Sequence, residues 1–254
     1  MTKEQVDQEL SEIFSDSPSE VEQEVELPSR GIFYSPRIDK IKIKPLLFED
    51  EKSILLAKKN KIDVLEHIFQ RCLVGSTSEF LSNMVAIDKI YLTIKLREIS
   101  FSKNYKANVV CPGCNNQYEV IIGIDEIPVN YYDKDKMDPL EIMLPNLKKL
   151  VKVKVLRSKD EYLYAKAENT LVDNLWRFVA EIAGKTNPVV IAKALEKLTL
   201  LDAKVIIDTI TLQGYGIDPK FEYVCSDERC QYKGILDIPL TEDFFTMSSL
   251  GLET

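Results

Sequence analysis

The segments VVCPGCNNQYEV (residues 109–120) and YVCSDERCQYKG (residues 223–234) hold four of the five cysteines of this 254-residue chain. In each, a cysteine pair lies between short runs in which apolar and polar residues alternate, which is typical of a β-hairpin. Two residues separate Cys111 from Cys114 and four separate Cys225 from Cys230, and zinc ligands show such spacings. The sequence therefore predicts two cysteine-bearing hairpins that supply the ligands of one tetrahedral zinc ion.

The two cysteine pairs are 111 residues apart, far more than in a compact zinc ribbon. We expect a pseudo-two-fold arrangement in which the hairpins meet at one zinc-ribbon-like site, with one structural zinc per chain. Iron accepts the same ligands, so the metal's identity stays open. Two other arrangements also stay open: incomplete sites that another chain completes, and a disulfide within each pair, which an intracellular location disfavours. Four thiolates leave no open coordination position for catalysis.

Beyond the hairpins, the two halves of the chain match in order. Residues 27–57 (LPSRGIFYSPRIDKIKIKPLLFEDEKSILLA) resemble residues 144–167 (LPNLKKLVKVKVLRSKDEYLYAKA). Each segment begins with Leu-Pro, passes through an alternating run typical of a strand, and reaches an Asp-Glu pair of the kind that opens a helix. This order predicts a strand followed by a helix in both halves.

The match continues through two segments that we interpret as helices, VLEHIFQRCLVG (64–75) and VDNLWRFVAEIAG (172–184). Each ends at a glycine, as the end of a helix often does. The segments that follow, 84–101 and 198–215, also match, and each half closes with a cysteine pair and an acid-Ile-Pro sequence. Chance alignment of two segments of mixed structure remains the alternative to a duplication.

These patterns predict an α+β fold of two tandem pseudo-symmetric repeats joined at the four-cysteine site. Each repeat contains strands, helices and one cysteine-bearing hairpin. The expected boundaries are an acidic, disordered arm (1–26), the first repeat (27–129), a linker (130–139), the second repeat (140–240) and a C-terminal tail (241–254).

The arm holds most of the charge imbalance. Residues 1–26 contain nine acidic residues and one lysine, whereas the rest of the chain has 32 acids and 32 bases. A solvated tail is one interpretation. The other is a segment that folds onto a partner protein, because four apolar residues share one face of a helix. These candidate partner-binding residues are Val6, Leu10, Ile13 and Phe14.

Composition argues against several classes of protein. The apolar runs are shorter than the roughly 18 residues of a membrane span, so we expect a soluble intracellular protein with no membrane partner. A neutral body disfavours a large nucleic-acid footprint. Alternating lysines at 40–44 and 148–154 nevertheless leave one rival open, a zinc-ribbon protein that binds nucleic acid or a polymerase. No catalytic motif is found. The single histidine, His67, and the fifth cysteine, Cys72, both fall in a helix-like segment. We expect no small-molecule substrate.

The first half resembles the family of baseplate hub subunits and hub assembly proteins of T-even-type contractile-tailed bacteriophages. The resemblance covers residues 27 to about 125 and implies a non-enzymatic protein that acts through contacts with other baseplate hub proteins. It implies either an assembly factor or chaperone or a hub subunit, found in the host cytoplasm during assembly or in the virion baseplate. The second half lacks the Gly and Tyr of SRGIFY. The matching positions are Leu27, Pro28, Gly31, Tyr34, Pro45, Asp88, Arg97, Cys111 and Cys114.

Overall fold

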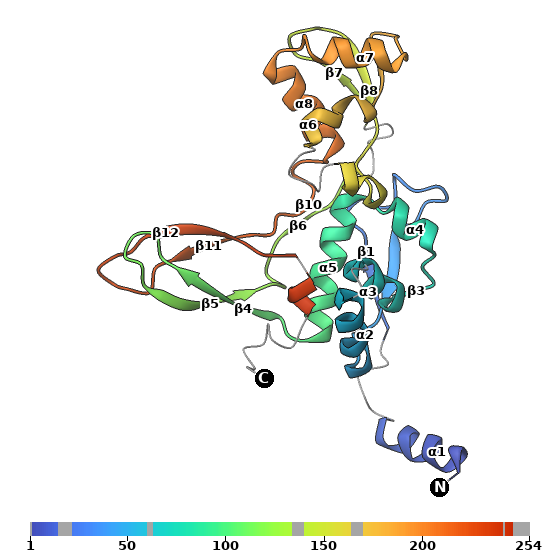
Figure 1. Cartoon of the computed structure of the whole chain (residues 1–254), viewed down its shortest axis with the longest axis vertical. Helices are drawn as coiled ribbons and strands as arrows, with labels where there is room; N and C mark the ends of the chain where they lie inside the picture. Colours follow the sequence, from blue (N-terminus) through green and yellow to red (C-terminus); the bar gives the residue numbers. More distant parts are fainter. Residues whose placement is uncertain are drawn as a thin grey trace.

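The computed structural model describes residues 2–14, 22–59, 63–133, 140–163, 170–240 and 242–245. They form helices and several small antiparallel sheets around two separate apolar cores. Figure 1 shows a lower and an upper body along the long axis, a pair of hairpins beside the lower body, and a helix below it. The predicted combination of helices and strands is confirmed.

The lower body contains a three-stranded antiparallel sheet. In its central strand the alternation in KIKI buries Ile41 and Ile43 and leaves Lys40 and Lys42 in solvent, because successive side chains of a strand point to opposite faces. The sheet thus presents one apolar face to the core. Its strands pair in the order β1 (Gln23–Glu26), β2 (Lys40–Ile43) and β3 (Leu73–Val74).

Helix α5 (Ala86–Ser100) is the centre of the lower core. It buries eight of its residues, including the charged Asp88 and Arg97, and a helix that is buried on most sides requires cover from every direction. The sheet, the neighbouring helices and the C-terminal residues supply that cover. The other helices of this body are α2 (Phe48–Lys59), α3 (Val64–Cys72) and α4 (Ser78–Asn83).

The upper body has its own core and a second three-stranded antiparallel sheet, in the order β7 (Glu141–Met143), β8 (Leu150–Val153) and β9 (Val179–Ile182). Asn187 caps the helix that Pro188 begins, since its side chain accepts backbone N–H groups of the first turn. The helices are α6 (Leu171–Asn174), α7 (Pro188–Leu195) and α8 (Leu200–Ile210), with short 3-10 helices at Ser158–Leu163 and Leu175–Arg177.

The helical interpretation of residues 64–75 and 172–184 is wrong for the last residues of each segment, which include a strand. Helix α3 ends at Cys72 and leads directly into strand β3, whereas α6 ends at Asn174 and the 3-10 helix Leu175–Arg177 precedes strand β9. In both halves the strand comes before the glycine. The register explains the difference, because β9 pairs with β8 and buries Val179 and Ile182 in the upper core. This tertiary pairing outweighs a helix-like local pattern.

The two cysteine segments lie in hairpins, as predicted. The first, β4 (Asn104–Val110) and β5 (Gln117–Gly123), and the second, β11 (Lys220–Val224) and β12 (Lys233–Asp237), project side by side from the lower body. A short antiparallel pair, β6 (Val129–Asn130) and β10 (Gly216–Ile217), joins the chain after the first hairpin to the chain before the second.

The described elements of the two halves follow a similar order: two strands, short helices, a third strand, two further helices and a hairpin. The second half differs in where its hairpin lies. Its own core runs from Leu144 to Ile210, whereas Leu212, Ile217 and Ile238 belong to the lower core. The second hairpin therefore packs with the first half of the chain and not with its own body.

The N-terminal segment has more structure than the expected disordered arm. Lys3–Phe14 form helix α1, and Gln23–Glu26 form strand β1. Val6, Leu10 and Ile13 are exposed by 37%, 45% and 70%, so the apolar residues of α1 are uncovered. The side chain of Phe14 lies outside the described part of the chain. Figure 1 shows α1 at the end of the molecule opposite the upper body.

The expected C-terminal tail contains a buried anchor. Residues 242–245 form a 3-10 helix, and Phe244 and Phe245 are buried in the lower core. Phe244 packs against Tyr105 of the first hairpin, with ring centroids 5.0 Å apart. These residues therefore tie the C-terminal segment to the first half of the chain.

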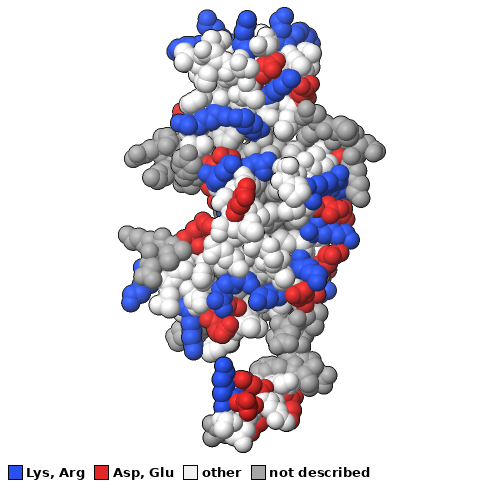
Figure 2. Space-filling model, turned by 90° about the vertical axis from the view of Figure 1, so that its right-hand side faces the viewer, with Lys and Arg blue, Asp and Glu red and all other residues white. Residues whose placement is uncertain are grey.

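The longest helix of the described ranges, α5, has 15 residues. Among the described residues, no helix has the length and apolar character needed to cross a membrane. Figure 2 shows acidic and basic side chains interspersed over the face of the lower body in view, and mainly basic ones at the upper end of the molecule.

Candidate metal centre

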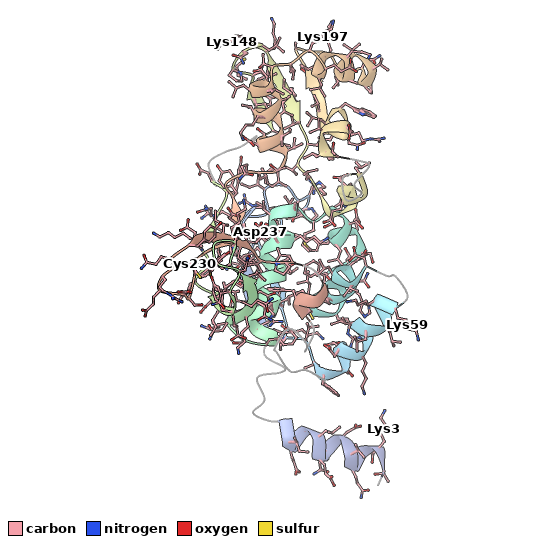
Figure 3. All side chains as sticks on the ribbon, turned by 60° about the vertical axis from the view of Figure 1, so that its left-hand side comes forward. Lys3, Lys59, Lys148, Lys197, Cys230 and Asp237 are labelled. Carbon is pink, nitrogen blue, oxygen red and sulfur yellow. The ribbon has the colours of Figure 1, made fainter. Side chains whose placement is uncertain are left out.

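The four hairpin cysteines converge on one point, near the labelled Cys230 in Figure 3. Their sulfur atoms all lie within 4.8 Å of one another. Two short contacts join the hairpins, with Cys111 Sγ 3.8 Å from Cys230 Sγ and Cys114 Sγ 3.7 Å from Cys225 Sγ. All five cysteines of the chain are free thiols. A single chain therefore brings together four sulfur ligands, two from each hairpin.

The spacing of these sulfurs fits a tetrahedral metal ion. With zinc–sulfur bonds of about 2.3 Å, the edges of a ZnS4 tetrahedron are about 3.8 Å long. The two contacts between the hairpins, at 3.8 and 3.7 Å, have this length. A disulfide bond would require about 2.05 Å. The donor set is compatible with zinc or iron.

The two cysteine turns have similar local geometry. The backbone N–H of Gly113 donates to Cys111 Sγ at 3.3 Å, and that of Asp227 donates to Cys225 Sγ at 3.5 Å. Backbone N–H groups that point at a sulfur stabilise its thiolate form. In each turn the residue after the second cysteine has a positive φ, and these residues are Asn115 and Gln231.

Gly113 permits the close approach of the two hairpins. A Cβ atom at this position would lie 2.9 Å from Cys230 Sγ and 3.2 Å from the Cβ of Tyr232, both on the second hairpin. Further along the hairpins, the rings of Tyr118 and Tyr223 meet edge to face with centroids 6.4 Å apart. The contact of Gly113 with the second hairpin is a tertiary feature that its local sequence does not show.

The pKa values of the four thiols indicate how readily each thiol would ionise without a bound cation. Burial of Cys111 acts to raise its pKa, but the backbone N–H groups of Cys114 and Gly113 and the neighbouring thiols lower it to about 7. The pKa values of Cys114, Cys225 and Cys230 are raised: backbone N–H groups lower them, but burial and neighbouring thiols outweigh that effect. A bound cation would supply the charge needed to ionise all four.

A second buried polar cluster surrounds Asp88 on α5. Its carboxylate accepts the backbone N–H of Ser29 at 2.9 Å, the Ser29 hydroxyl at 2.6 Å and the Tyr34 hydroxyl at 2.7 Å. The Tyr34 oxygen in turn accepts the backbone N–H of Val85 at 3.0 Å. These bonds fasten the LPSRGIFY segment to the start of α5, so the residues that carry the family resemblance have a structural role here.

Burial raises the pKa of Asp88, although the bonds from Ser29 and Tyr34 lower it in part. Burial, together with the charge of Asp88, raises the pKa of Tyr34 well above its ordinary value. Position 31 requires glycine, because its φ is +70° and a Cβ there would lie 2.4 Å from the backbone of Ile38.

The upper body has a counterpart at the start of α8. Asp202 is 1% exposed, and its carboxylate accepts the backbone N–H groups of Asn146 at 2.9 Å and Leu147 at 3.1 Å. In both halves, therefore, a buried aspartate in the first turn of a long helix holds the turn that follows a Leu-Pro pair. The two clusters differ in that the donors to Asp202 belong to exposed residues.

Arg97 connects α5 to the C-terminal anchor. Its guanidinium donates to the backbone carbonyl of Phe244 and lies 4.4 Å from the ring centroid of Phe101 and 5.3 Å from that of Phe244. Burial lowers the pKa of this guanidinium. Aromatic faces stabilise a buried cation, so Arg97 is held by the C-terminal residues that it helps to fix.

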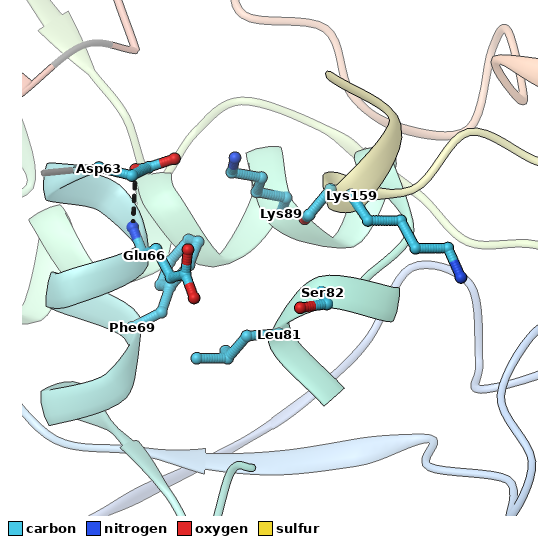
Figure 4. Close-up of a pocket in the computed structure, with 8 residues that line it drawn as sticks. Asp63, Glu66, Phe69, Leu81, Ser82, Lys89 and Lys159 are labelled. Atoms are coloured by element: carbon cyan, nitrogen blue, oxygen red, sulfur yellow. Dashed lines mark hydrogen bonds between the residues drawn. The ribbon is translucent and has the colours of Figure 1, made fainter. Parts of the chain in front are cut away.

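Figure 4 shows a small cavity where α3, α4 and α5 meet residues 158 and 159. Its volume is about 80 Å³, several times smaller than the roughly 300–1,000 Å³ of ordinary ligand sites. Lys89 at its edge forms an ion pair with Glu161 at 2.7 Å. The residues that line it are Asp63, Glu66, Phe69, Leu81, Ser82, Lys89, Ser158 and Lys159.

Cys72 lies apart from the four-cysteine cluster. It is fully buried at the end of α3, and burial raises the pKa of its thiol to about 12. A protonated, buried thiol behaves as a small apolar side chain. His67, on the same helix, is half-buried.

Comparison with known proteins identifies a family. A family model described as T4 bacteriophage base plate protein matches residues 20–215. No curated protein and no solved structure matches the chain. The family match spans both bodies and the first hairpin, and it covers well over half of the 254 residues. This chain therefore belongs to the T4 bacteriophage base plate protein family.

Proposed function

We propose that this protein is a non-enzymatic hub protein of the phage tail baseplate that acts in hub assembly through protein–protein contacts. It serves either as an assembly factor or chaperone or as a subunit of the hub. The family match to base plate proteins carries the proposal. The roles of the motif residues support it, because Gly31, Tyr34 and Asp88 hold the LPSRGIFY segment against the start of α5.

The experiment that tests this proposal uses phage in which the gene is inactivated. We expect incomplete tails without a functional hub, rescued by the protein supplied in trans. Its presence in purified mature particles would identify a subunit, and its absence from them an assembly factor. Normal tails in the absence of the protein would refute the proposal.

We further propose that Cys111, Cys114, Cys225 and Cys230 bind one structural zinc ion per chain. The convergence of four sulfurs at tetrahedral spacing supports this. The ion would connect the two hairpins and thereby the second half of the chain to the lower body. Native mass spectrometry under reducing conditions would test it: one zinc per chain is expected, iron would change the assignment, and a metal-free chain with intact thiols would exclude both.

The similar order of elements supports a proposal that the chain arose from two tandem repeats. Both halves contain a three-stranded antiparallel sheet, a helix with a buried aspartate in its first turn, and a hairpin with two cysteines. On this interpretation the hairpins are equivalent parts that meet at the metal site. Separate similarity of both halves to one ancestral unit, in more distant sequences, is the expected result.

The rival function in nucleic-acid binding has less support. Lys40 pairs with Glu24 at 3.0 Å, Lys42 with Glu22 at 3.0 Å, and Lys152 with Glu141 at 2.9 Å. These three paired lysines offer less net charge to phosphate groups, whereas Lys148 and Lys149 of the same runs form no ion pair among the described residues. A gel-shift assay at low and moderate salt should show no tight complex.

A further inference from the structure

The end of the upper body farthest from α1 carries a surface of exposed leucines and lysines. Three turns form it: the β7–β8 turn, the turn after β9, and the α7–α8 turn. Figure 3 shows Lys148 and Lys197 together at this end of the molecule, with Lys3 of α1 at the other. We name it the leucine–lysine tip, and its residues are Leu147, Lys148, Lys149, Leu150, Lys185, Lys197, Leu200 and Leu201.

Hydrogen bonds fix the three turns relative to one another. Asn146 Nδ2 donates to Thr199 Oγ1 at 2.8 Å, which joins the β7–β8 turn to the α7–α8 turn. The bonds of Asp202 to the same β7–β8 turn add to this connection. The backbone N–H of Ala183 donates to the carbonyl of Leu150 at 2.9 Å and fixes the third turn. The tip is therefore a preformed surface and not a set of independent loops.

The tip is apolar and basic at once. Leu200 is 90% exposed and Leu201 52%, and Leu147 and Leu150 are also exposed. Among the residues that the structure describes, none of the four tip lysines forms an ion pair. Figure 2 shows basic side chains at this upper end. Exposed leucines bordered by unpaired lysines are suited to an acidic partner with an apolar stripe.

Helix α1 has the complementary chemistry. Its apolar residues Val6, Leu10 and Ile13 are exposed and recur at the spacing of one helix face. At about 100° per residue, Asp7 and Glu9 lie on either side of that stripe, and Lys3 lies between the stripe and Asp7. Helix α1 itself carries four acidic residues, Glu4, Asp7, Glu9 and Glu12, against Lys3. Both the apolar stripe and its acidic borders thus match the leucines and lysines of the tip.

We propose that α1 of one copy of this protein docks on the leucine–lysine tip of a second copy. The two surfaces lie at opposite ends of the long axis, so the contact would join copies head to tail. This contact goes beyond the proposed baseplate role and gives the arm a specific partner. Because a three-turn helix covers far less than the about 800 Å² per partner of a standard interface, we expect weak association, with Kd on the order of 100 μM.

Sedimentation velocity of the full-length protein tests the proposal. We expect the average mass to rise between ~10 and ~500 μM protein, and the association to weaken about tenfold when salt is raised from low to high concentration. The double variant Lys148→Glu/Lys197→Glu should abolish it, as should Asp7→Lys/Glu9→Lys. The matched control Lys220→Glu/Lys233→Glu makes the same charge change on exposed residues of the second hairpin and should leave association unchanged.

Mixing the two charge-reversed variants gives the sharpest test. In each variant alone, residues 7 and 9 of the arm and residues 148 and 197 of the tip carry charges of the same sign, whereas in the mixture the arm of each variant meets these tip positions with the opposite sign. Association should therefore return in the mixture. A wild-type chain that stays monomeric over the whole concentration range, or a mixture that fails to associate when the wild type does, overturns the proposal.

Phage complementation separates this inference from the proposed function. If the tip variant supports growth while deletion of residues 1–22 does not, the arm binds another baseplate protein and self-docking is excluded. The baseplate role would then stand. Failure of both charge-reversed variants to support growth singly, together with restored growth when the two are supplied together, would support docking between copies.

Discussion

Replacing Asp88 by alanine tests whether the buried carboxylate holds the first half of the chain together. The substitution removes the acceptor of three donors, the Ser29 N–H, the Ser29 hydroxyl and the Tyr34 hydroxyl. Each buried donor left without a partner costs about 1–3 kcal/mol. Relief of the cost of burying a carboxylate, which raises the pKa of Asp88, offsets part of the sum. We expect the free energy of unfolding to fall by about 3–5 kcal/mol.

Asp88→Asn and Asp202→Ala provide matched comparisons. Asparagine keeps one acceptor for the Ser29 N–H, so about 1–3 kcal/mol should be lost. Asp202→Ala should cost less than Asp88→Ala, because the two N–H donors that it frees belong to Asn146 and Leu147, which are exposed to water. The losses of unfolding free energy in the three variants are thus ranked by the number of buried donors that each substitution leaves without an acceptor.

Urea denaturation followed by circular dichroism and by fluorescence would measure these losses. The single tryptophan, Trp176, packs against the upper core, so its fluorescence follows the upper body while circular dichroism follows both. Asp88→Ala should mainly shift the transition of the lower body and Asp202→Ala that of Trp176. A loss below about 1 kcal/mol for Asp88→Ala would refute the account of this network.

Four further predictions concern titration and the metal centre. Because the folded-state pKa of Asp88 is raised, the contribution of this carboxyl group to stability is greatest at low pH and falls as pH rises from about 4 through the folded pKa. In unfolding curves measured over a range of pH, Asp88→Asn should remove that fall. Cys225→Ser should abolish stoichiometric zinc, measured by elemental analysis, and lower Tm, and unchanged metal content would contradict the assigned ligands. Gly113→Ala should cost about 1–3 kcal/mol and weaken metal retention against a chelator, whereas Gly75→Ala, where φ is +73° and the added Cβ meets no atom beyond its chain neighbours within 4 Å, should strain the backbone locally and affect retention little. Cys72 should resist alkylation at about pH 8 in the folded protein, because its pKa is about 12, and should react only on unfolding.

Several features could be predicted from local sequence because the chemistry of the residues limits the alternatives. Alternating runs on either side of cysteine pairs predicted β4, β5, β11 and β12. Thiols in pairs at metal-ligand spacing predicted that the two hairpins would meet, and the four sulfurs do lie together. The spacing of Val6, Leu10 and Ile13 indicated one helix face, and α1 forms with these residues exposed, although the arm as a whole was expected to be disordered.

Other features depended on contacts between distant residues. The segment that contains β9 has a helix-like pattern, and only pairing with β8 makes a strand of it. Phe244 and Phe245 lie in a short segment that the sequence assigned to a tail, and Arg97 and Tyr105 provide contacts to Phe244 from far earlier in the chain. Neither hydrophobic periodicity nor a helix-capping residue in the local sequence indicates that such residues are buried.

Local sequence was sufficient to specify the hairpins, their four candidate ligands and the apolar helix face of the acidic arm. Strand alternation, ligand chemistry and helix periodicity are properties of short segments. Long-range packing was needed to place the second hairpin against the lower core and away from its own body. The same packing lets Asp88 and Asp202 hold the Leu-Pro turns and gathers leucines and lysines from three turns into one surface. The physical reason is that burial and hydrogen-bond partners are shared between residues far apart in the chain, so no single segment specifies them.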